Sequence, residues 1–276
     1  MSFLKSVLLA FSMFSTVPMP RVEWNQKNMR YMMCAFPLVG VFTAVLCAAW
    51  FLFGIQILYI WNKNIPLPLF ALVFTLIPVL ISGGIHLDGF MDTCDALASH
   101  ASQEKKLEIL KDSHSGAFAV LGCVLYFLSF YVLSYCLYTR FFGADSSHRF
   151  VNLFARFYNS LPALSLFVLS RLLSAFAVAA FPIAKNSGLV HTFASSSAKR
   201  FTAIWCYVWF FLVSIALIFF FRFLGIALVA SSLAAFCFYY ITAIKNFGGI
   251  TGDTAGWFVQ ICELVGLAVF VIFSFL

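Results

Sequence analysis

Long apolar runs separated by short polar segments make up most of this chain. The runs occupy residues 32–60, 66–82, 116–138, 160–182, 201–221, 223–244 and 257–276. A lipid bilayer offers the backbone no hydrogen-bond partner, so a run of about 20 apolar residues that enters it must be helical. The pattern therefore predicts an all-α fold, a polytopic integral membrane bundle of about seven transmembrane helices.

A shorter apolar stretch lies at residues 3–19 and is interrupted by polar residues and a proline. We expect it to form a short span, or to re-enter the membrane or lie in its interface. It has one lysine and no small-residue cleavage site, which favours a retained segment over a cleaved signal. No internal repeat or low-complexity linker divides the chain, so residues 1–276 are interpreted as one membrane-embedded domain.

Composition supports the membrane assignment. The chain is 63% hydrophobic and 10% charged, with a mean hydropathy of +0.99, whereas soluble proteins carry about 25% charged residues. The eight cysteines form no Cys-x-x-Cys pair, and most lie in the apolar runs. We interpret them as packing residues and predict neither disulfides nor a zinc site.

The positive charge is distributed in a way that predicts topology. The 17 lysines and arginines give a net charge of +7 but form no dense basic run, which argues against nucleic-acid binding. If the seven runs alternate sides, segments 21–31, 83–115, 183–200 and 245–256 share one face with ten Lys or Arg, against five opposite. The positive-inside rule then places this face in the cytoplasm, at a prokaryotic plasma (inner) membrane.

Six of the ten acidic residues lie between residues 88 and 112. Asp88, Asp92 and Asp95 are spaced i, i+4 and i+7, which places them within about 60° on one helix face. Carboxylates that converge so closely repel one another unless a hard cation lies between them. Oxygen-only ligands favour Mg²⁺, Mn²⁺ or Ca²⁺ over zinc, so the segment predicts a divalent metal site.

Further polar residues surround this acidic segment. Gly83 and Gly84 precede it, and glycines let a ligand approach the backbone and leave N–H groups for phosphate oxygens. His86 is a candidate base or phosphate contact, or a hydrogen-bonded structural histidine. Residues 104–108 suggest a solvated amphipathic helix. Asp112 precedes the next apolar run and is either a helix cap or a ligand.

A second polar segment lies at residues 245–256, with four glycines and one carboxylate, Asp253. Glycines beside an acid again suggest a backbone nest for anionic oxygens. Continued as a helix, the segment carries Glu263 into the bilayer within about 80° of Asp253. An intramembrane carboxylate is functional by default. The alternative is that Glu263 snorkels or pairs with a buried arginine such as Arg171.

The predicted topology brings both polar segments to the same membrane face. Carboxylates for a divalent metal, together with glycine loops for phosphate, are typical of sites that act on phosphoryl or pyrophosphoryl substrates. In such sites, positioning and charge neutralisation provide most of the catalysis. We therefore expect a single site built from both segments.

The order and spacing of short motifs along nearly the whole chain is specific. The motifs are Phe11-Ser12, Pro18-Met19-Pro20, the segments 36–40, 84–95 and 107–113, Gly116, Ser170-Arg171, and the segment 248–253. This joint pattern closely resembles that of the adenosylcobinamide-GDP ribazoletransferases, the cobalamin-5′-phosphate synthases.

The resemblance implies a reaction and a set of site residues. The reaction is transfer of α-ribazole, or its 5′-phosphate, onto adenosylcobinamide-GDP with Mg²⁺, releasing GMP and forming adenosylcobalamin or its 5′-phosphate. The implied metal ligands are Asp88, Asp92, Asp95, Asp112 and Asp253. The implied catalytic residues are Asp88, Asp92, Asp95 and His86, with Asp95 or His86 as the candidate proton acceptor. The implied substrate-binding residues are Gly83, Gly84, Lys111, Asp112, Ser113, Lys245, Gly248, Gly249, Thr251, Gly252 and Asp253.

The chain departs from the family pattern at two positions. His114 stands where an arginine is expected, and Lys245 where an arginine is common. Because arginine and lysine differ in how they bind phosphate, these changes bear on individual phosphate contacts rather than on the reaction. The implied partners are small-molecule corrinoid and nucleoside substrates and membrane lipid, with a homo-oligomer or other cobalamin-assembly enzymes as further candidates.

Three other classes fit the sequence less well. A CDP-alcohol phosphotransferase has Asp-Gly followed by Ala-Arg, whereas Phe90-Met91 follows Asp88-Gly89 here. An intramembrane prenyltransferase has an aspartate-rich motif in each half, whereas the later polar segment holds a single aspartate, Asp253. A divalent-cation transporter tends to carry acids near the membrane midplane and an internal repeat. Here the aspartates are predicted at one membrane face, and no repeat is evident.

Overall fold

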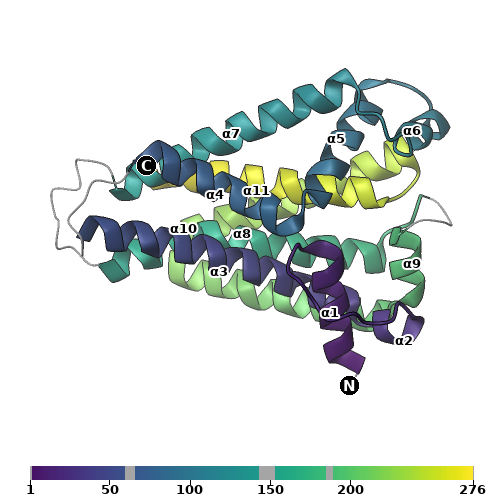
Figure 1. Ribbon diagram of the computed structural model, residues 1–276, viewed down its shortest axis with the longest axis horizontal. Coiled ribbons are helices and arrows are strands. Elements are labelled where there is room, and N and C mark those ends of the chain that lie inside the picture. Colours follow the sequence, from purple (N-terminus) through teal and green to yellow (C-terminus); the bar gives the residue numbers. More distant parts are fainter. Residues whose placement is uncertain (1, 60–65, 143–152, 185–188, 276) are drawn as a thin grey trace.

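The computed structural model describes residues 2–59, 66–142, 153–184 and 189–275, and these residues form an elongated helical bundle (Figure 1). The helices are α1 (Ser2–Phe14), α2 (Gln26–Met29), α3 (Met32–Tyr59), α4 (Leu67–Ser82), α5 (Ile85–Ala98), α6 (Gln103–Ile109), α7 (Ala117–Phe142), α8 (Leu153–Ala180), α9 (Leu189–Ser196), α10 (Lys199–Phe247) and α11 (Gly252–Phe275). The all-α prediction is confirmed.

Five helices of the described residues are long and apolar enough to cross a membrane, namely α3, α7, α8, α10 and α11. With 49 residues, α10 would be about 70 Å long if straight, more than twice a hydrocarbon core of about 30 Å. However, Arg222 has non-helical angles (φ 48°, ψ −118°), and Gly225 packs onto the backbone of Leu217. The chain therefore reverses at Arg222, and the two arms match the runs predicted at 201–221 and 223–244.

The predicted run at 66–82 corresponds to α4, which has only 16 residues. α4 meets the criteria for a span only together with α5, from which it is bent by 92°. α5 therefore runs across the bundle rather than along it (Figure 1). We treat α4 as the crossing helix and the three aspartates of α5 as lying outside the spanning segments.

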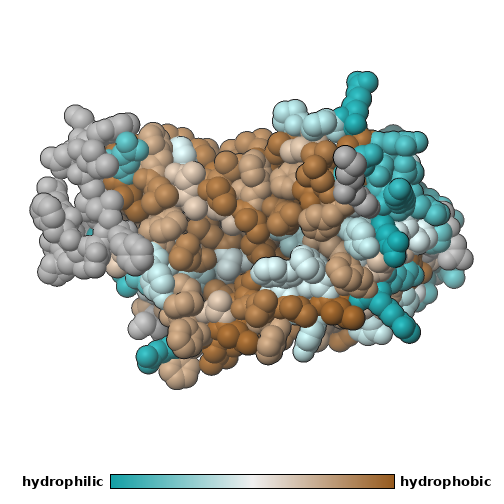
Figure 2. Space-filling view, turned by 90° about the horizontal axis from the view of Figure 1, so that it is seen from below, coloured by the Kyte–Doolittle hydropathy of each residue, from teal (hydrophilic) through white to brown (hydrophobic). Residues whose placement is uncertain are grey.

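The segments that were predicted to share one membrane face do lie together. Two backbone hydrogen bonds connect three of them, Ala198 N to Arg30 O (3.1 Å) and Ala184 N to Ile250 O (3.0 Å). The side chain of Gln103 donates to Lys245 O (2.9 Å), which connects segment 83–115 to the others. We call the end of the bundle that holds α5, α6 and the first turn of α11 the acidic end. Figure 2 shows apolar side chains across the middle of the visible face and many hydrophilic ones gathered at this end.

The N-terminal apolar stretch forms α1, which at 13 residues is about 20 Å long and too short to cross the core of a bilayer. Instead, α1 packs against α3, where the rings of Phe11 and Phe42 meet edge to face at 5.9 Å. The sequence left open a short transmembrane span or a re-entrant or interfacial segment, and the length of α1 favours the re-entrant or interfacial segment.

Arg171 and Glu263 form an ion pair at the centre of the bundle, between α8 and α11, with each side chain only 1% exposed. Ser170 donates a hydrogen bond to Glu263 Oε1 (2.8 Å), and the Arg171 guanidinium also donates to the carbonyl oxygen of Phe167 (3.0 Å). The alternative in which Glu263 pairs with Arg171 is confirmed. This intramembrane carboxylate holds two helices together.

Candidate metal and phosphate site at the acidic end

α5 carries the three aspartates, as the i, i+4, i+7 spacing predicted. Asp88 is exposed, and Asp92 and Asp95 are half-buried. The other side of α5 packs into the bundle, with His86, Phe90 and Thr93 all buried. The helix thus presents its acids along the open side of the acidic end, while its apolar residues anchor it.

The two polar segments meet where α5 crosses the start of α11. A Cβ atom on Gly89 would lie 2.7 Å from the Cα atom of Asp253, and one on Gly256 would lie 3.0 Å from the backbone oxygen of His86. Only glycine allows backbones to approach so closely. The contact brings Asp253, in the first turn of α11, beside the aspartates of α5, and it confirms the predicted convergence of the two segments.

The carboxylates in this cluster influence one another. Burial raises the pKa of Asp92 to about 6, and the charges of Asp88, Asp253 and Asp95 add to this effect. Each neighbouring carboxylate disfavours a further negative charge, and a cation between them would reverse that effect. The electrostatics of the site therefore suit a bound divalent cation.

The donor set fits Mg²⁺ in a particular way. Within the described residues, no three His, Cys, Asp or Glu side chains lie close enough together to form a ready-made metal site. Mg²⁺ is usually held by one or two carboxylates, with water and substrate phosphates completing its shell. The chemistry of the cluster fits an ion held jointly by protein and phosphate, and the assignment of Asp88, Asp92 and Asp253 as its ligands stays a prediction.

Asp95 has a structural contact that the sequence did not reveal. Its carboxylate accepts hydrogen bonds from Ala119 N (2.8 Å) and Gly116 N, so it caps the N-terminus of α7. A Cβ atom on Gly116 would lie 2.7 Å from both carboxylate oxygens, which explains the glycine there. The assignment of Asp95 as a metal ligand stays a prediction.

The capping alternative for Asp112 is wrong, because Asp95 caps α7 instead. Asp112 Oδ1 accepts a hydrogen bond from His114 N (3.0 Å) and lies 2.8 Å from His114 Nδ1. These hydrogen bonds lower the pKa of Asp112. Asp112, Lys111 and Ser113 are all exposed in the connection between α6 and α7, where a substrate can reach them.

The glycines have a different function from the one expected. Gly83, Gly84 and Gly248 have positive φ angles of 63°, 79° and 72°, and they end α4 and α10. Their N–H groups donate to carbonyl oxygens of the preceding helix, as does that of Gly249. The expectation that these four N–H groups are available to phosphate is therefore wrong, and what the glycines provide is a sharp reversal of the chain.

The start of α11 is held rigidly. Thr254 N donates to Thr251 Oγ1 (3.1 Å), and Thr251 N donates to Thr254 Oγ1 (2.9 Å). This reciprocal arrangement resembles a capping box. It fixes the first turn, which contains Gly252 and Asp253, at the end of the helix where the dipole favours an anion.

Residues 104–108 lie in α6, which packs one side against the end of α10, and the predicted solvated amphipathic helix is wrong only for Lys106. Lys106 is 8% exposed, and its Nζ donates to Asn246 Oδ1 (2.7 Å). Gln103 Nε2 donates to the backbone oxygen of Lys245 (2.9 Å). The prediction is confirmed for Lys105 and Glu108, which form an exposed ion pair at 2.9 Å. The Lys245 side chain is exposed.

His86 is buried against the aromatic rings of Phe14 and Phe36. Its ring lies 6.3 Å from that of Phe14 and 5.7 Å from that of Phe36. Its Nε2 has no hydrogen-bond partner among the described residues. The ring of His86 thus makes a structural contact that joins α5 to α1 and α3. The catalytic role of His86 stays a prediction.

Comparison with known proteins identifies the family. A family model described as cobalamin-5-phosphate synthase matches residues 6–271. Three relatives are named adenosylcobinamide-GDP ribazoletransferase. One from Lachnoclostridium phytofermentans is 38% identical over 98% of this chain and 94% of its own length. One from Clostridium botulinum strain Alaska E43 is 32% identical over 95% of both chains, and one from Fusobacterium nucleatum is 29% identical over 98% of both.

No solved structure matches the chain significantly. The family match nevertheless covers both polar segments and every helix that contributes to the acidic end. The chain therefore belongs to the cobalamin-5-phosphate synthase family.

Proposed function

We propose that this protein transfers α-ribazole, or its 5′-phosphate, onto adenosylcobinamide-GDP, releasing GMP. The product is adenosylcobalamin or its 5′-phosphate. Family membership and the names of the relatives support this reaction. The observation that carries the proposal is the contact of Gly89 with Asp253, which joins an aspartate helix and a second acidic helix start into one site at the acidic end.

In the proposed reaction, an oxygen of the ribose hydroxyl forms a bond to the phosphorus attached to the corrinoid side chain. The bond from this phosphorus to the oxygen of GMP breaks, and GMP leaves with the electron pair. The hydroxyl proton passes to a base, for which Asp95 and His86 are the candidates. The Asp95 carboxylate already accepts hydrogen bonds from Gly116 N and Ala119 N, which occupy part of its capacity to accept hydrogen bonds.

Bound Mg²⁺ would neutralise charge on the pyrophosphate. Asp88, Asp92 and Asp253 would hold the ion, with Asp112 as a further ligand from the exposed connection. Lys111 and Lys245 are exposed cations suited to phosphate oxygens. Because the site is at one end of the bundle, a bulky amphipathic corrinoid would reach it from the membrane surface.

We further propose that the acidic end faces the cytoplasm of a bacterial cell, at the plasma membrane. The support is the excess of lysine and arginine in the segments on this side, ten against five. Soluble nucleotide and nucleoside substrates would then reach the site directly.

The test is GMP release by the purified chain, reconstituted in lipid vesicles with adenosylcobinamide-GDP, α-ribazole and Mg²⁺. We expect GMP only when all three are present, and we expect EDTA to abolish its formation and excess Mg²⁺ to restore it. If folded protein releases no GMP, the substrate assignment is wrong. GMP formation that continues undiminished in EDTA would remove the metal from the proposal and leave the substrates in place.

Gly89→Ala is expected to damage the site by pushing α5 and α11 apart. The added Cβ meets backbone atoms of Asp253, which cannot rotate away. Overpacking of this kind costs about 1–3 kcal/mol, and the shift should lower GMP formation about tenfold. The matched control is Gly54→Ala, whose Cβ meets side-chain ring atoms rather than backbone, those of Phe70 at 3.1 Å and Phe142 at 3.5 Å. Equal GMP formation by both variants would contradict the importance of the contact.

A further inference from the structure

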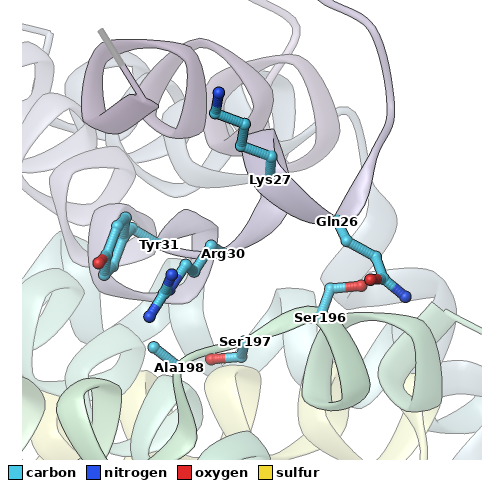
Figure 3. A pocket seen from close by; sticks show the side chains of 7 residues that line it. All are labelled: Gln26, Lys27, Arg30, Tyr31, Ser196, Ser197 and Ala198. Carbon is cyan, nitrogen blue, oxygen red and sulfur yellow. The ribbon is translucent and has the colours of Figure 1, made fainter.

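A cavity lies at the same end of the bundle as the acidic cluster, where α2 and the start of α3 face the junction of α9 and α10. Its volume is about 590 Å³. The polar side chains that line it are those of Gln26, Lys27, Arg30, Tyr31, Ser196 and Ser197 (Figure 3). Figure 3 shows Arg30 extending toward Ser197 and Ala198, and Gln26 toward Ser196. None of these residues was singled out by the sequence motifs.

The walls of this cavity are fixed by hydrogen bonds. Arg30 O accepts from Ala198 N (3.1 Å), which ties α2 to the start of α10. On the far side of α2, Asn28 N donates to Asn25 Oδ1 (2.9 Å), and Ser6 donates to Asn28 O (2.6 Å). The cavity is therefore built into the fold, as pockets for small ligands usually are.

The charge around the cavity is positive. Lys27 and Arg30 line it, and Lys199 and Arg200 follow directly after its last lining residue, all four of them exposed. The acidic residue in the described segments that form the walls of the cavity is Glu23. Its carboxylate accepts a hydrogen bond from Asn25 Nδ2 (2.9 Å). Cations and serine hydroxyls together are suited to the oxygens of a phosphate group.

An exposed apolar surface begins at the edge of the cavity. The ring of Tyr31 meets that of Phe201 at 5.5 Å, and Phe201 and Ile204 on α10 are 49% and 64% exposed. Trp24 on the adjoining segment is 48% exposed, as expected of an aromatic residue at a membrane interface. A ligand that occupies the cavity thus lies between a cationic wall and a surface that lipid tails cover.

From this juxtaposition we propose that the cavity binds the phosphate of an anionic membrane lipid, whose acyl chains lie along the exposed face of α10. Basic pockets between helices at a membrane surface recognise anionic headgroups in this way. A soluble phosphate would use the cationic wall but would make no use of the apolar surface. The proposal is independent of the reaction at the acidic cluster.

The experiment titrates the detergent-purified full chain with dioleoylphosphatidylglycerol or dioleoylphosphatidylcholine and measures the first bound lipid by native mass spectrometry. The variants are Lys27→Gln, Arg30→Gln and the double variant. The control is the double variant Lys105→Gln with Arg140→Gln, which also removes one lysine charge and one arginine charge, but away from the cavity. We expect the double variant to bind the anionic lipid about twentyfold more weakly than wild type, and each single variant about fivefold more weakly. Phosphatidylcholine binding should not change.

Three results would overturn the proposal. The first is equal affinity of the wild type for the two lipids. The second is an equal loss of affinity for the anionic lipid in the cavity variants and in the control variant. The third is complete displacement of the anionic lipid by glycerol 3-phosphate at an equal concentration, which would make a free phosphate the ligand. The variants should fold, because the substituted side chains are exposed. Unchanged phosphatidylcholine binding shows that each variant is folded.

Discussion

Asp92→Asn is expected to lower GMP formation about a thousandfold, because loss of one carboxylate removes several kcal/mol of metal-assisted stabilisation of the transition state. Asp92 lies at the centre of the acidic cluster, where burial and the charges of Asp88, Asp253 and Asp95 all act on it. Asparagine keeps the size of the side chain and removes its charge. The measurement is the initial rate of GMP release at saturating substrates over a range of Mg²⁺ concentrations.

The matched control for Asp92→Asn is Glu104→Gln, which removes an exposed carboxylate from the first turn of α6. Its rate should remain within about twofold of wild type, since exposed charges distant from a site are largely screened. The thermal stability of Asp92→Asn should be equal to that of wild type or higher, because the substitution relieves repulsion among carboxylates. A rate within tenfold of wild type would exclude Asp92 as a metal ligand.

Arg171→Met is expected to destabilise the protein by about 3–5 kcal/mol, because it leaves the Glu263 carboxylate buried without its counter-ion. Both side chains are 1% exposed, so water cannot replace the lost partner. The measurement is thermal unfolding of the purified protein in detergent, followed by intrinsic fluorescence, with the fraction that remains monodisperse as a second readout.

Removing both charges separates the role of the ion pair from that of side-chain volume. The double variant Arg171→Met with Glu263→Gln should recover most of the lost stability, since no unpaired charge remains. If the double variant is as unstable as the single one, packing rather than charge accounts for the loss. A single variant as stable as wild type would show that the pair does not stabilise the bundle.

The sequence predicted the helices well because a bilayer leaves the backbone few choices. Each apolar run became a helix, and even the reversal at Arg222 fell between two predicted runs. Simple alternation of spans was also enough to predict that residues 83–115 and 245–256 meet. These predictions depend on local composition and on chain direction, which a single sequence contains.

Long-range pairing was not predictable in the same way. Asp95 caps a helix that begins 22 residues later, and Lys106 binds Asn246 across the acidic end. Both side chains look like ordinary polar residues in sequence, because nothing near them indicates a distant partner. The expected availability of the glycine N–H groups to phosphate was wrong for a related reason, since the carbonyl oxygen to which each group donates depends on how the helix ends.

The contact between Gly89 and Asp253 also has a consequence for the point in synthesis at which the proposed site is completed. The ribosome makes α5 long before α11, and the two residues are 164 positions apart. A nascent chain that has inserted α5 but not α11 lacks Asp253. It therefore lacks both the carboxylate of this residue and the backbone atoms that pack against Gly89. An incomplete chain in the membrane therefore carries the aspartate helix without the second part of the proposed site, and on the proposed function we expect activity only after α11 is in place.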